Sequence, residues 1–229
     1  LAMVDSSVGG KTGINVKQGK NLIGAFHQPK LVLADLDVLQ TLAPTERSAG
    51  MAEVIKYGVI YDAELFAYIE SHVQQLTRLD LNALTYVVRC SCEIKAEVVR
   101  LDEKEGGLRA ILNYGHTLGH AIENATEYGR FLHGEAISIG MVYASVLSEK
   151  KRGLNPEATR RQKALFEAFN LPTTLPDLTW ADLRNAMAVD KKSVASIPRF
   201  VLASKIGKVD FGFEVTEELY DLEKDPLEL

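Results

Sequence analysis

The sequence predicts a mainly helical domain preceded by the tail of an α/β domain, and three observations support this fold class. After residue 44, apolar residues recur at helical spacing between residues that start and stop helices. The first 44 residues instead combine a glycine-rich segment with one short apolar run. The composition, 46% hydrophobic and 25% charged over 229 residues, is that of an ordinary globular protein. We therefore place the domain boundary between residues 1–44 and 45–229.

The first 44 residues are expected to be mostly irregular. Residues 5–24 contain five glycines, which predicts a loop. Residues 30–35 (KLVLAD) predict a short buried strand, and 39–44 predict a connection. The N-terminus, LAMVDSSVGGKTG, has neither the basic nor the apolar region of a signal peptide, so no targeting segment is predicted. The other strands of this α/β domain are expected to precede Leu1.

The remaining sequence predicts helices separated by short connections. A charged connector, DEKEGG, follows the third helix, and Gly153 is expected to end the fifth. Two short runs, 199–203 and 207–211, predict a small β-hairpin. The predicted helices cover about 45–59, 62–71, 80–101, 108–126, 133–153, 157–169, 180–188 and 216–223.

Composition also limits the partners and the location of the protein. The net charge of −5 argues against nucleic-acid binding. The longest apolar stretch, 136–147, is too short to span a membrane and predicts a buried helix instead. Cys90 and Cys92 lie two apart in a predicted helix and point to different sides, so they are expected to be reduced thiols of a cytoplasmic protein.

Three histidines lie close together in the sequence. His116, His120 and Glu123, in NYGHTLGHAIE, are spaced so that they project from one face of a helix. His133 begins the next helix in LHGEA. Two imidazoles one turn apart can share a divalent metal, or one can bind the metal while the other transfers a proton. The alternative is an amphipathic helix with half-buried histidines.

A carboxylate would complete the usual open catalytic zinc set. Spacing alone leaves Glu53, Glu123 and Glu135 as candidates. An HExxH motif is absent, which disfavours a zincin-type protease.

Several basic residues could supply an anion site near such a metal. Glu53 and Lys56 are three apart and are therefore neighbours on one helix. A single lysine is typical of a solvated surface, but several that converge on a metal would bind phosphate and carboxylate groups. The candidates are Lys11, Lys20, Lys56, Lys95, Arg109, Lys191 and Lys192.

Five segments together resemble the 3-dehydroquinate synthase family. They follow the family's order and approximate spacing and read DSSVGGKTGIN, GKNLIGAFHQP, AGMAEVIKYG, DEKEGGLRAILNYGHTLGHAIE and LHGEAISIGM. The resemblance spans almost the whole chain. It implies that residues 1–44 are the C-terminal remnant of an NAD-binding α/β domain and that 45–229 form a helical metal- and substrate-binding domain. The family's N-terminal dinucleotide-binding half, with its glycine-rich NAD loop, is expected before Leu1.

The resemblance also implies roles for individual residues. Zinc, with Co²⁺ as an alternative ion, is expected on Glu53, His116 and His133. Glu105 and His120 correspond to residues that transfer protons. NAD is expected to contact Lys11, Lys20, Val38, Leu39, Gln40 and Thr41. The substrate is expected to contact Asp5, Lys11, Asn21, Lys56, Lys95, Arg109, Asn113 and one of Lys191 and Lys192.

The family's reaction accounts for these residue types. The resemblance implies an NAD- and zinc-dependent carbon–oxygen (phosphorus–oxygen) lyase, a cytoplasmic homodimer of the shikimate pathway to chorismate and the aromatic amino acids. Its substrate would be the phosphorylated seven-carbon keto acid 3-deoxy-D-arabino-heptulosonate 7-phosphate, and its products 3-dehydroquinate and phosphate. Zinc acidifies the hydroxyls it binds, and fixed cations balance phosphate and carboxylate.

Three alternatives remain. A metal-dependent polyol dehydrogenase would need metal and NAD but not the residues Lys56, Lys95, Arg109 and Asn113. A sibling sugar-phosphate cyclase would make another carbocycle, although GGKTG and GGLRAILN look more like the dehydroquinate enzyme. A third alternative is a non-catalytic truncated domain, because the chain without the N-terminal half is expected to bind NAD weakly and to be inactive.

Overall fold

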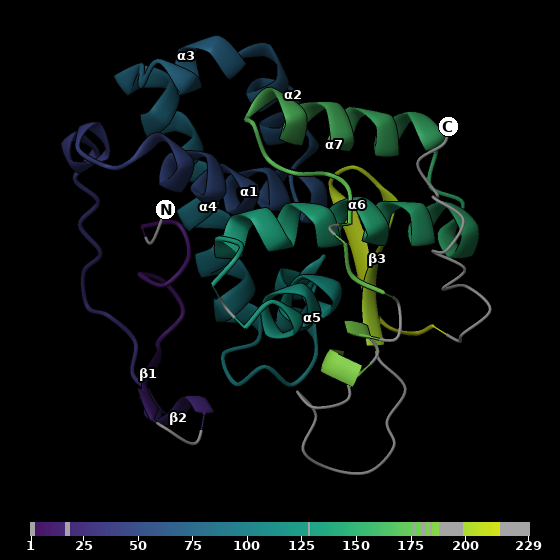
Figure 1. Cartoon of the computed structure of the whole chain (residues 1–229). Helices are drawn as coiled ribbons and strands as arrows, with labels where there is room; N and C mark the ends of the chain where they lie inside the picture. The colour runs from purple at the N-terminus through teal and green to yellow at the C-terminus, as the bar shows by residue number, and fades with distance from the viewer. Residues whose placement is uncertain are drawn as a thin grey trace.

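The computed structural model describes residues 3–16, 19–127, 129–175, 177–179, 182–183, 185–187 and 199–215, with only the backbone described at 15 and 19–22. This part of the chain is mainly helical and contains two separate two-stranded antiparallel hairpins (Figure 1). The predicted fold class is therefore confirmed. No helix within the described ranges is both long and apolar enough to cross a membrane.

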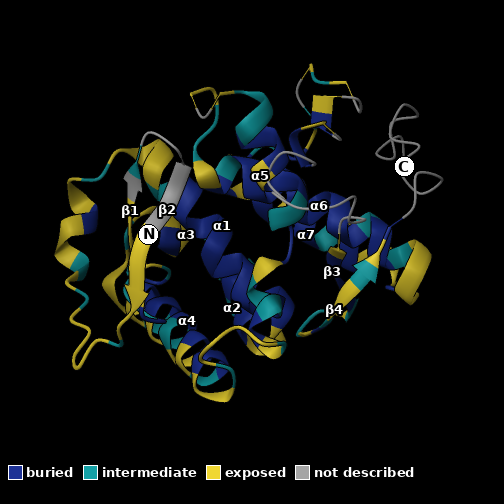
Figure 2. Ribbon diagram, turned by 90° about the horizontal axis from the view of Figure 1, so that it is seen from below, coloured by how far each residue is buried: buried dark blue, intermediate teal, exposed yellow. Residues whose placement is uncertain are grey.

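Two long helices form the centre of the molecule, α1 (Pro44–Ile60) and α6 (His133–Arg152). Every residue of α1 from 49 to 60 is buried, and most of α6 is buried as well (Figure 2). Gly153 caps the C-terminal end of α6, as predicted. The two helices touch at Gly134, where an added Cβ would lie 1.8 Å from the carbonyl oxygen of Ala49. This close backbone approach fixes the start of α6 against α1.

Four helices surround this centre: α2 (Ala63–Ser71), α3 (Val73–Thr77), α4 (Leu81–Leu101) and α7 (Pro156–Ala168). The predictions of α2, α4 and α7 are confirmed, whereas the single turn of α3 was not expected. The starts of α2, α4 and α7 follow from capping chemistry, because a short polar side chain accepts hydrogen bonds from the free amides of the first turn. The capping residues are Asp62, Asp80 and Asn155.

The single helix predicted over 108–126 is wrong, because the chain forms two elements there. Residues Leu108–Asn113 form a 3-10 helix, η2, and α5 covers His116–Ala125. Gly115 lies between them with φ of 77°. This left-handed conformation interrupts a helix, and glycine adopts it without a steric penalty. The break makes His116 the first residue of α5.

The hairpin predicted near 199–211 is confirmed. Strands β3 (Arg199–Lys205) and β4 (Lys208–Glu214) pair antiparallel and lie beside α6 (Figure 1). The Ala203 amide donates to Ser148 Oγ of α6 at 2.9 Å. Of the helix predicted over 180–188, residues 182–183 and 185–187 are described and are helical. The helix predicted over 216–223 lies outside the described residues.

The N-terminal predictions need two corrections. Where a loop was expected, β1 (Lys11–Val16) and β2 (Gly19–Phe26) form an antiparallel hairpin. Glycine content alone does not reveal that Gly13 and Gly24 pair across the two strands. The strand expected over 30–35 is absent, since no described strand pairs with this segment, and Leu31 and Leu33 are 81% and 87% exposed. The chain then forms the 3-10 helix η1 (Leu36–Gln40).

Residues 3–9 form a turn that is fastened to the helices. Val4 is fully buried, and its carbonyl accepts from Tyr57 Oη of α1 at 3.0 Å. Cys92 Sγ of α4 donates to the carbonyl of Met3 at 3.2 Å. This turn therefore packs against the helices that carry Glu53 and Lys95.

Candidate metal centre

Glu53 places a carboxylate inside the helical core. It lies in the buried run of α1 and is 4% exposed. A buried carboxylate is costly unless it is paired. Its Oε2 accepts from Lys56 Nζ, one turn along the helix, at 2.5 Å. Its Oε1 is buried without a hydrogen-bond partner, so it is free to accept one further interaction.

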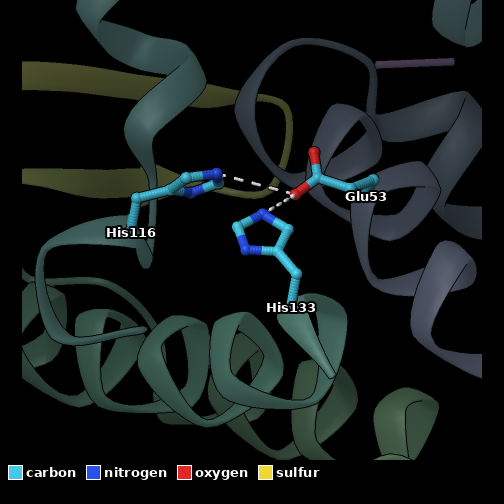
Figure 3. Close-up of side chains that lie close together, drawn as sticks. All are labelled: Glu53, His116 and His133. Carbon is cyan, nitrogen blue, oxygen red and sulfur yellow. Dashed lines mark ion pairs between the residues drawn. The ribbon is translucent and has the colours of Figure 1, made fainter. Parts of the chain in front are cut away.

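Two imidazole nitrogens face this oxygen. The Nε2 atoms of His116 and His133 each lie 3.6 Å from Glu53 Oε1 (Figure 3). These distances are too long for hydrogen bonds. Ligands bonded to one tetrahedral zinc at about 2.0–2.2 Å lie roughly 3.4 Å from each other. The three side chains, one from each of α1, α5 and α6, therefore have the spacing of ligands around an ion, and they form one of two possible metal-binding groups among the described residues.

The local structure fixes both imidazole rings. His116 and His133 are the first residues of α5 and α6, so each is held at a defined helix start. On the opposite side of each ring, Nδ1 has a partner. The His116 Nδ1 lies 3.1 Å from the Tyr114 carbonyl oxygen, and the His133 Nδ1 lies 3.3 Å from Glu123 Oε1. Both rings thus present Nε2 to Glu53.

The electrostatics differ among the three groups. Burial and the charge of Lys56 lower the pKa of His116 to about 3, so this imidazole is neutral at neutral pH. Burial lowers the pKa of His133, but Glu123 and Glu53 outweigh that effect and raise it to about 9. Burial raises the pKa of Glu53, yet Lys56 and the two histidines hold it well below its usual value. The carboxylate is therefore ionised, as a metal ligand must be.

The donor set fits a divalent ion of the zinc type. It offers one carboxylate oxygen and two imidazole nitrogens, which leaves a fourth position for water or substrate. The buried Oε1 of Glu53 would gain the partner that it lacks. A cation here would also take the position that a proton on His133 would otherwise occupy. The expectation that zinc binds these residues stays a prediction.

A cavity of about 530 Å³, lined by both polar and apolar residues, adjoins this centre. Glu105, Asn113, His116 and His120 all line it. The His120 ring centre lies 5.3 Å from that of His116 and 6.0 Å from that of His133. His120 therefore lies beside the metal centre, at the wall of a space that can hold a small substrate. Four of the predicted site residues are thus brought together around one cavity.

The predicted cationic residues are placed close by but are engaged by protein groups. Lys95 donates to the Asp5 carboxylate at 2.5 Å and also to the Asp5 carbonyl. Burial raises the pKa of Asp5, but Lys95 and Lys56 outweigh burial and lower it. Arg109 is buried and donates to the carbonyls of Gly9 and Glu103, both at 2.8 Å. None of the three cations lines the cavity described above.

The remaining predicted residues lie away from the metal centre or are not among the residues that the structure describes. Lys11 begins β1 and pairs with Glu105 across to the loop after α4. Residues 38–41 lie in and just after η1, at the far end of the connecting segment from the hairpin (Figure 1). The side chains of Lys20 and Asn21 are not described, and Lys191 and Lys192 lie outside the described residues.

Sequence reasoning missed the wall of the cavity that the C-terminal hairpin provides. Arg199, Phe200 and Phe211 line the cavity together with residues of η2 and α5. The Arg199 carbonyl accepts from Thr117 Oγ1 at 3.0 Å, which ties β3 to α5. The pattern predicted the hairpin itself. No spacing signal could have indicated its place, because β3 is far from the histidines in the sequence.

Comparisons with known proteins show which family this chain resembles. The family model described as 3-dehydroquinate synthase C-terminal matches residues 50–193, and the one described as 3-dehydroquinate synthase N-terminal matches residues 1–49. A 3-dehydroquinate synthase of Idiomarina loihiensis is 54% identical over 92% of this chain and 59% of its own length. One of Nitrosomonas europaea is 50% identical over 96% of this chain and 59% of its own length. The chain thus spans about three fifths of the length of these curated relatives.

Solved structures share the fold. The 2-epi-5-epi-valiolone synthase of Streptomyces hygroscopicus subsp. jinggangensis, with NAD⁺ and Zn²⁺ bound, is 30% identical with a TM-score of 0.85. It is matched over 96% of this chain and 61% of that one. A 2-deoxy-scyllo-inosose synthase complexed with carbaglucose-6-phosphate, NAD⁺ and Co²⁺ is 26% identical with a TM-score of 0.83 over 96% of this chain and 63% of that one. The family models, the curated relatives and the fold lead to one conclusion: this chain belongs to the 3-dehydroquinate synthase family.

Proposed function

We propose that this chain is the metal- and substrate-binding part of a 3-dehydroquinate synthase. The full enzyme would convert 3-deoxy-D-arabino-heptulosonate 7-phosphate to 3-dehydroquinate and phosphate. The observation that carries the proposal is the buried Oε1 of Glu53, which lacks a hydrogen-bond partner and faces two imidazole nitrogens beside a cavity. The 50–54% identity to curated 3-dehydroquinate synthases favours this activity over sibling cyclases, whose structures are 26–30% identical.

The ligands of the proposed ion are Glu53, His116 and His133. Zinc or cobalt bound there would acidify a substrate hydroxyl and polarise the ketone, while NAD would accept and return the hydride. The protein's part is to hold the substrate hydroxyls at the open side of this group. The neutral His116 and the ionised Glu53 are already in the protonation states that such a site requires.

His120 is proposed to move protons. It lines the cavity next to His116, so it can reach a substrate held there. An imidazole accepts and returns a proton near neutral pH, which suits a reaction that both removes and restores protons. Glu105, at the same cavity, would be a second proton carrier, and the Asn113 amide would orient a substrate hydroxyl.

The phosphate and carboxylate of the substrate need fixed positive charges. Lys56, Lys95 and Arg109 are the proposed counter-charges, and their buried positions beside Glu53, Asp5 and Gly9 would strengthen any ion pair that they form. We further propose that Lys11 and residues 38–41 contact NAD in the full enzyme, which would be a cytoplasmic homodimer.

The test is phosphate release by this chain fused behind the N-terminal part of the Idiomarina loihiensis relative. With NAD and zinc, the fusion should release phosphate from the seven-carbon keto acid at a rate on the order of 1–10³ per second. The chain alone should release little. His133→Ala should abolish release, whereas the matched control His72→Ala should not, because His72 stacks on Tyr68 far along the chain from the cavity residues.

Two outcomes would contradict the proposal. A folded, zinc-loaded fusion that releases no phosphate would show that the proposed activity is wrong. Release from other sugar phosphates, but not from the keto acid, would identify a sibling cyclase instead. Nuclear magnetic resonance of the product distinguishes 3-dehydroquinate from the other carbocycles.

A further inference from the structure

We infer that Glu123 is a positioning residue that orients His133 toward the metal, an inference that rests on the proposed metal centre. Glu123 lies in α5 and is buried, although its carboxylate is not one of the three proposed ligands. Its Oε1 lies 3.3 Å from the Nδ1 of His133, across the contact between α5 and α6. The imidazole of His133 is thus held between two carboxylates, Glu123 at Nδ1 and Glu53 at Nε2.

This arrangement selects one tautomer. An ionised carboxylate has no proton to donate, so Nδ1 must carry the proton that bonds to Glu123. In the neutral imidazole that binds a metal, the lone pair is then on Nε2, which is the atom that faces Glu53 and His116. A carboxylate behind a histidine also makes the imidazole a stronger ligand.

His133 needs this support more than His116 does. The side chain of His133 is 43% exposed, against 12% for His116. His116 is enclosed by the protein, and its Nδ1 faces the main-chain carbonyl of Tyr114. The ring of His133 has less packing to hold it, so its bond to Glu123 is the main restraint on its orientation.

The helix that carries Glu123 is packed closely against α6. α5 and α6 approach closely at Gly119, where an added Cβ would lie 2.5 Å from the side chain of Ile137 and 3.2 Å from the carbonyl of Ala136. Such close packing fixes the distance between the helix that carries Glu123 and the helix that begins with His133. The carboxylate therefore reaches the imidazole without a large loss of side-chain freedom.

A competing role for Glu123 is that of a direct ligand. With His120 and His133 it forms the second possible metal-binding group of the described residues. In that arrangement its carboxylate would bind an ion, and a second ion could share His133 with the first. Counting the ions bound per chain distinguishes this role from positioning.

The experiment measures zinc affinity of the full chain with zinc alone, by competition with a chromogenic chelator. Glu123→Gln keeps an acceptor for Nδ1 but removes the charge, and Glu123→Ala removes both. We expect weaker zinc binding by about 10-fold for glutamine and up to about 100-fold for alanine. Glu135→Gln is the matched control, because it removes one charge near His133 from a residue that bonds to the Leu132 amide. Its affinity should stay within about twofold of the parent chain.

A merely structural role is excluded by two further measurements. In a His133→Ala background, Glu123→Gln should change zinc affinity by less than about twofold, since its effect acts through the missing ring. The visible spectrum of bound Co²⁺ should change in Glu123→Ala and stay unchanged in Glu135→Gln, because only the former alters a ligand's orientation.

The outcomes separate this inference from the proposed function. Absence of zinc binding by the parent chain would overturn the metal centre and this inference together. Parent-like affinity in both Glu123 variants would overturn the inference alone. A full effect of Glu123→Gln in the His133→Ala background, or two ions per chain with one lost in Glu123→Gln, would show that Glu123 acts as a ligand.

Discussion

Two lysine–glutamate pairs, one in the helical body and one at the N-terminal hairpin, show how differently the two regions are held. Lys56 and Glu53 are 3% and 6% exposed and lie one turn apart on α1. Lys11 and Glu105 are 50% and 33% exposed and join β1 to the loop after α4. The same chemistry therefore occurs in a low-dielectric core and in water-accessible surroundings. The first pair is part of the buried candidate site, whereas the second holds the N-terminal hairpin to the surface of the helical body.

The apolar residues of the two regions differ in the same way. In the helical body, α1 and α6 bury nearly all of their apolar side chains. In the N-terminal segment, Ile14, Ile23, Phe26, Leu31 and Leu33 are all exposed. Exposed apolar groups of this extent are typical of surfaces that contact something else. The three proposed metal ligands therefore all lie in the region whose apolar side chains are buried.

The largest effect should come from breaking the buried pair. Lys56→Met keeps the length of the side chain but removes the lysine that pairs with the Glu53 carboxylate in the core. Removal of one partner from a buried pair costs about 3–5 kcal/mol of unfolding free energy. Denaturant unfolding, with a chelator in every sample, measures this loss.

The matched control is the double variant Glu53→Gln/Lys56→Met. It should recover most of the loss, because no unpaired charge remains in the core. It also reports on the pair if Lys56→Met alone does not fold. A loss below about 1 kcal/mol for Lys56→Met, the usual worth of an exposed pair, would contradict the burial argument.

A second pair of variants adds a methyl group to one glycine in each region. Both glycines lie against a backbone carbonyl oxygen, so neither has room for a Cβ. A Cβ would lie 1.8 Å from the Ala49 carbonyl oxygen at Gly134 and 2.0 Å from the Thr12 carbonyl oxygen at Gly24. Gly134→Ala should cost about 1–3 kcal/mol, because α1 and α6 cannot separate without disturbing the core. Gly24→Ala should cost less than about 0.5 kcal/mol of global stability, since the hairpin can open by itself.

Thermal unfolding measures the first effect and hydrogen exchange the second. Gly24→Ala should lower the protection of the β1 and β2 amides while leaving the amides of α1 protected. An equal fall in melting temperature for both variants would show that the hairpin and the helical body unfold as one unit.

Local signals explain what the sequence could predict. Asp62, Asp80 and Gly153 mark helix ends by chemistry that acts within one turn, so the bounds of α2, α4 and α6 were predictable. The break at Gly115 was not, because a glycine inside a helical pattern does not disclose its φ angle. The exposure of Leu31 and Leu33 was not predictable either, because whether an apolar run is buried depends on contacts that are distant in the sequence.

In the candidate site, too, local spacing was predictable and tertiary contacts were not. The spacing of His116 and His120 pointed to one helical face, and the structure places both rings at the cavity. Spacing could not choose Glu53 over Glu123, since the two carboxylates reach His133 from different helices. Tertiary packing alone assigns one carboxylate to each nitrogen of that ring.

A smaller effect is expected at the exposed pair. Lys11→Met removes a partner of Glu105 that water and salt already screen. Its cost should be no more than about 0.5–1 kcal/mol, measured in the same denaturant series as Lys56→Met. High salt should reduce the difference between Lys11→Met and the parent chain, and it should leave the loss in Lys56→Met nearly unchanged. A salt-independent loss would mean that the Lys11 pair is less exposed than its geometry indicates.

The smallest effect concerns the loop between α4 and η2, in which Glu105 pairs with Lys11 of the N-terminal hairpin. Asp102 Oδ1 accepts from the amide of Gly106 at 2.7 Å, and Oδ2 accepts from those of Gly107 and Arg109 at 2.8 and 2.9 Å. The Arg109 amide, followed by those of Gly106 and Gly107, lowers the pKa of Asp102 below its ordinary value of 3.8. A lowered carboxyl pKa means that the loop is stabilised above the ordinary value and loses this stabilisation as the pH falls through the lowered one.

We therefore expect the protection of the 106, 107 and 109 amides, corrected for intrinsic exchange, to be constant at neutral pH and to fall only below the ordinary carboxyl pKa. Asp102→Asn should lower that protection at neutral pH and remove its pH dependence, because an amide offers one acceptor oxygen without charge. The melting temperature should hardly change, since the loop lies outside the core formed by α1 and α6. Amides of α4 in the same samples serve as the control, because they report on acid unfolding of the helices. Equal protection of the three loop amides in Asp102→Asn and the parent chain would show that this carboxylate does not order the loop.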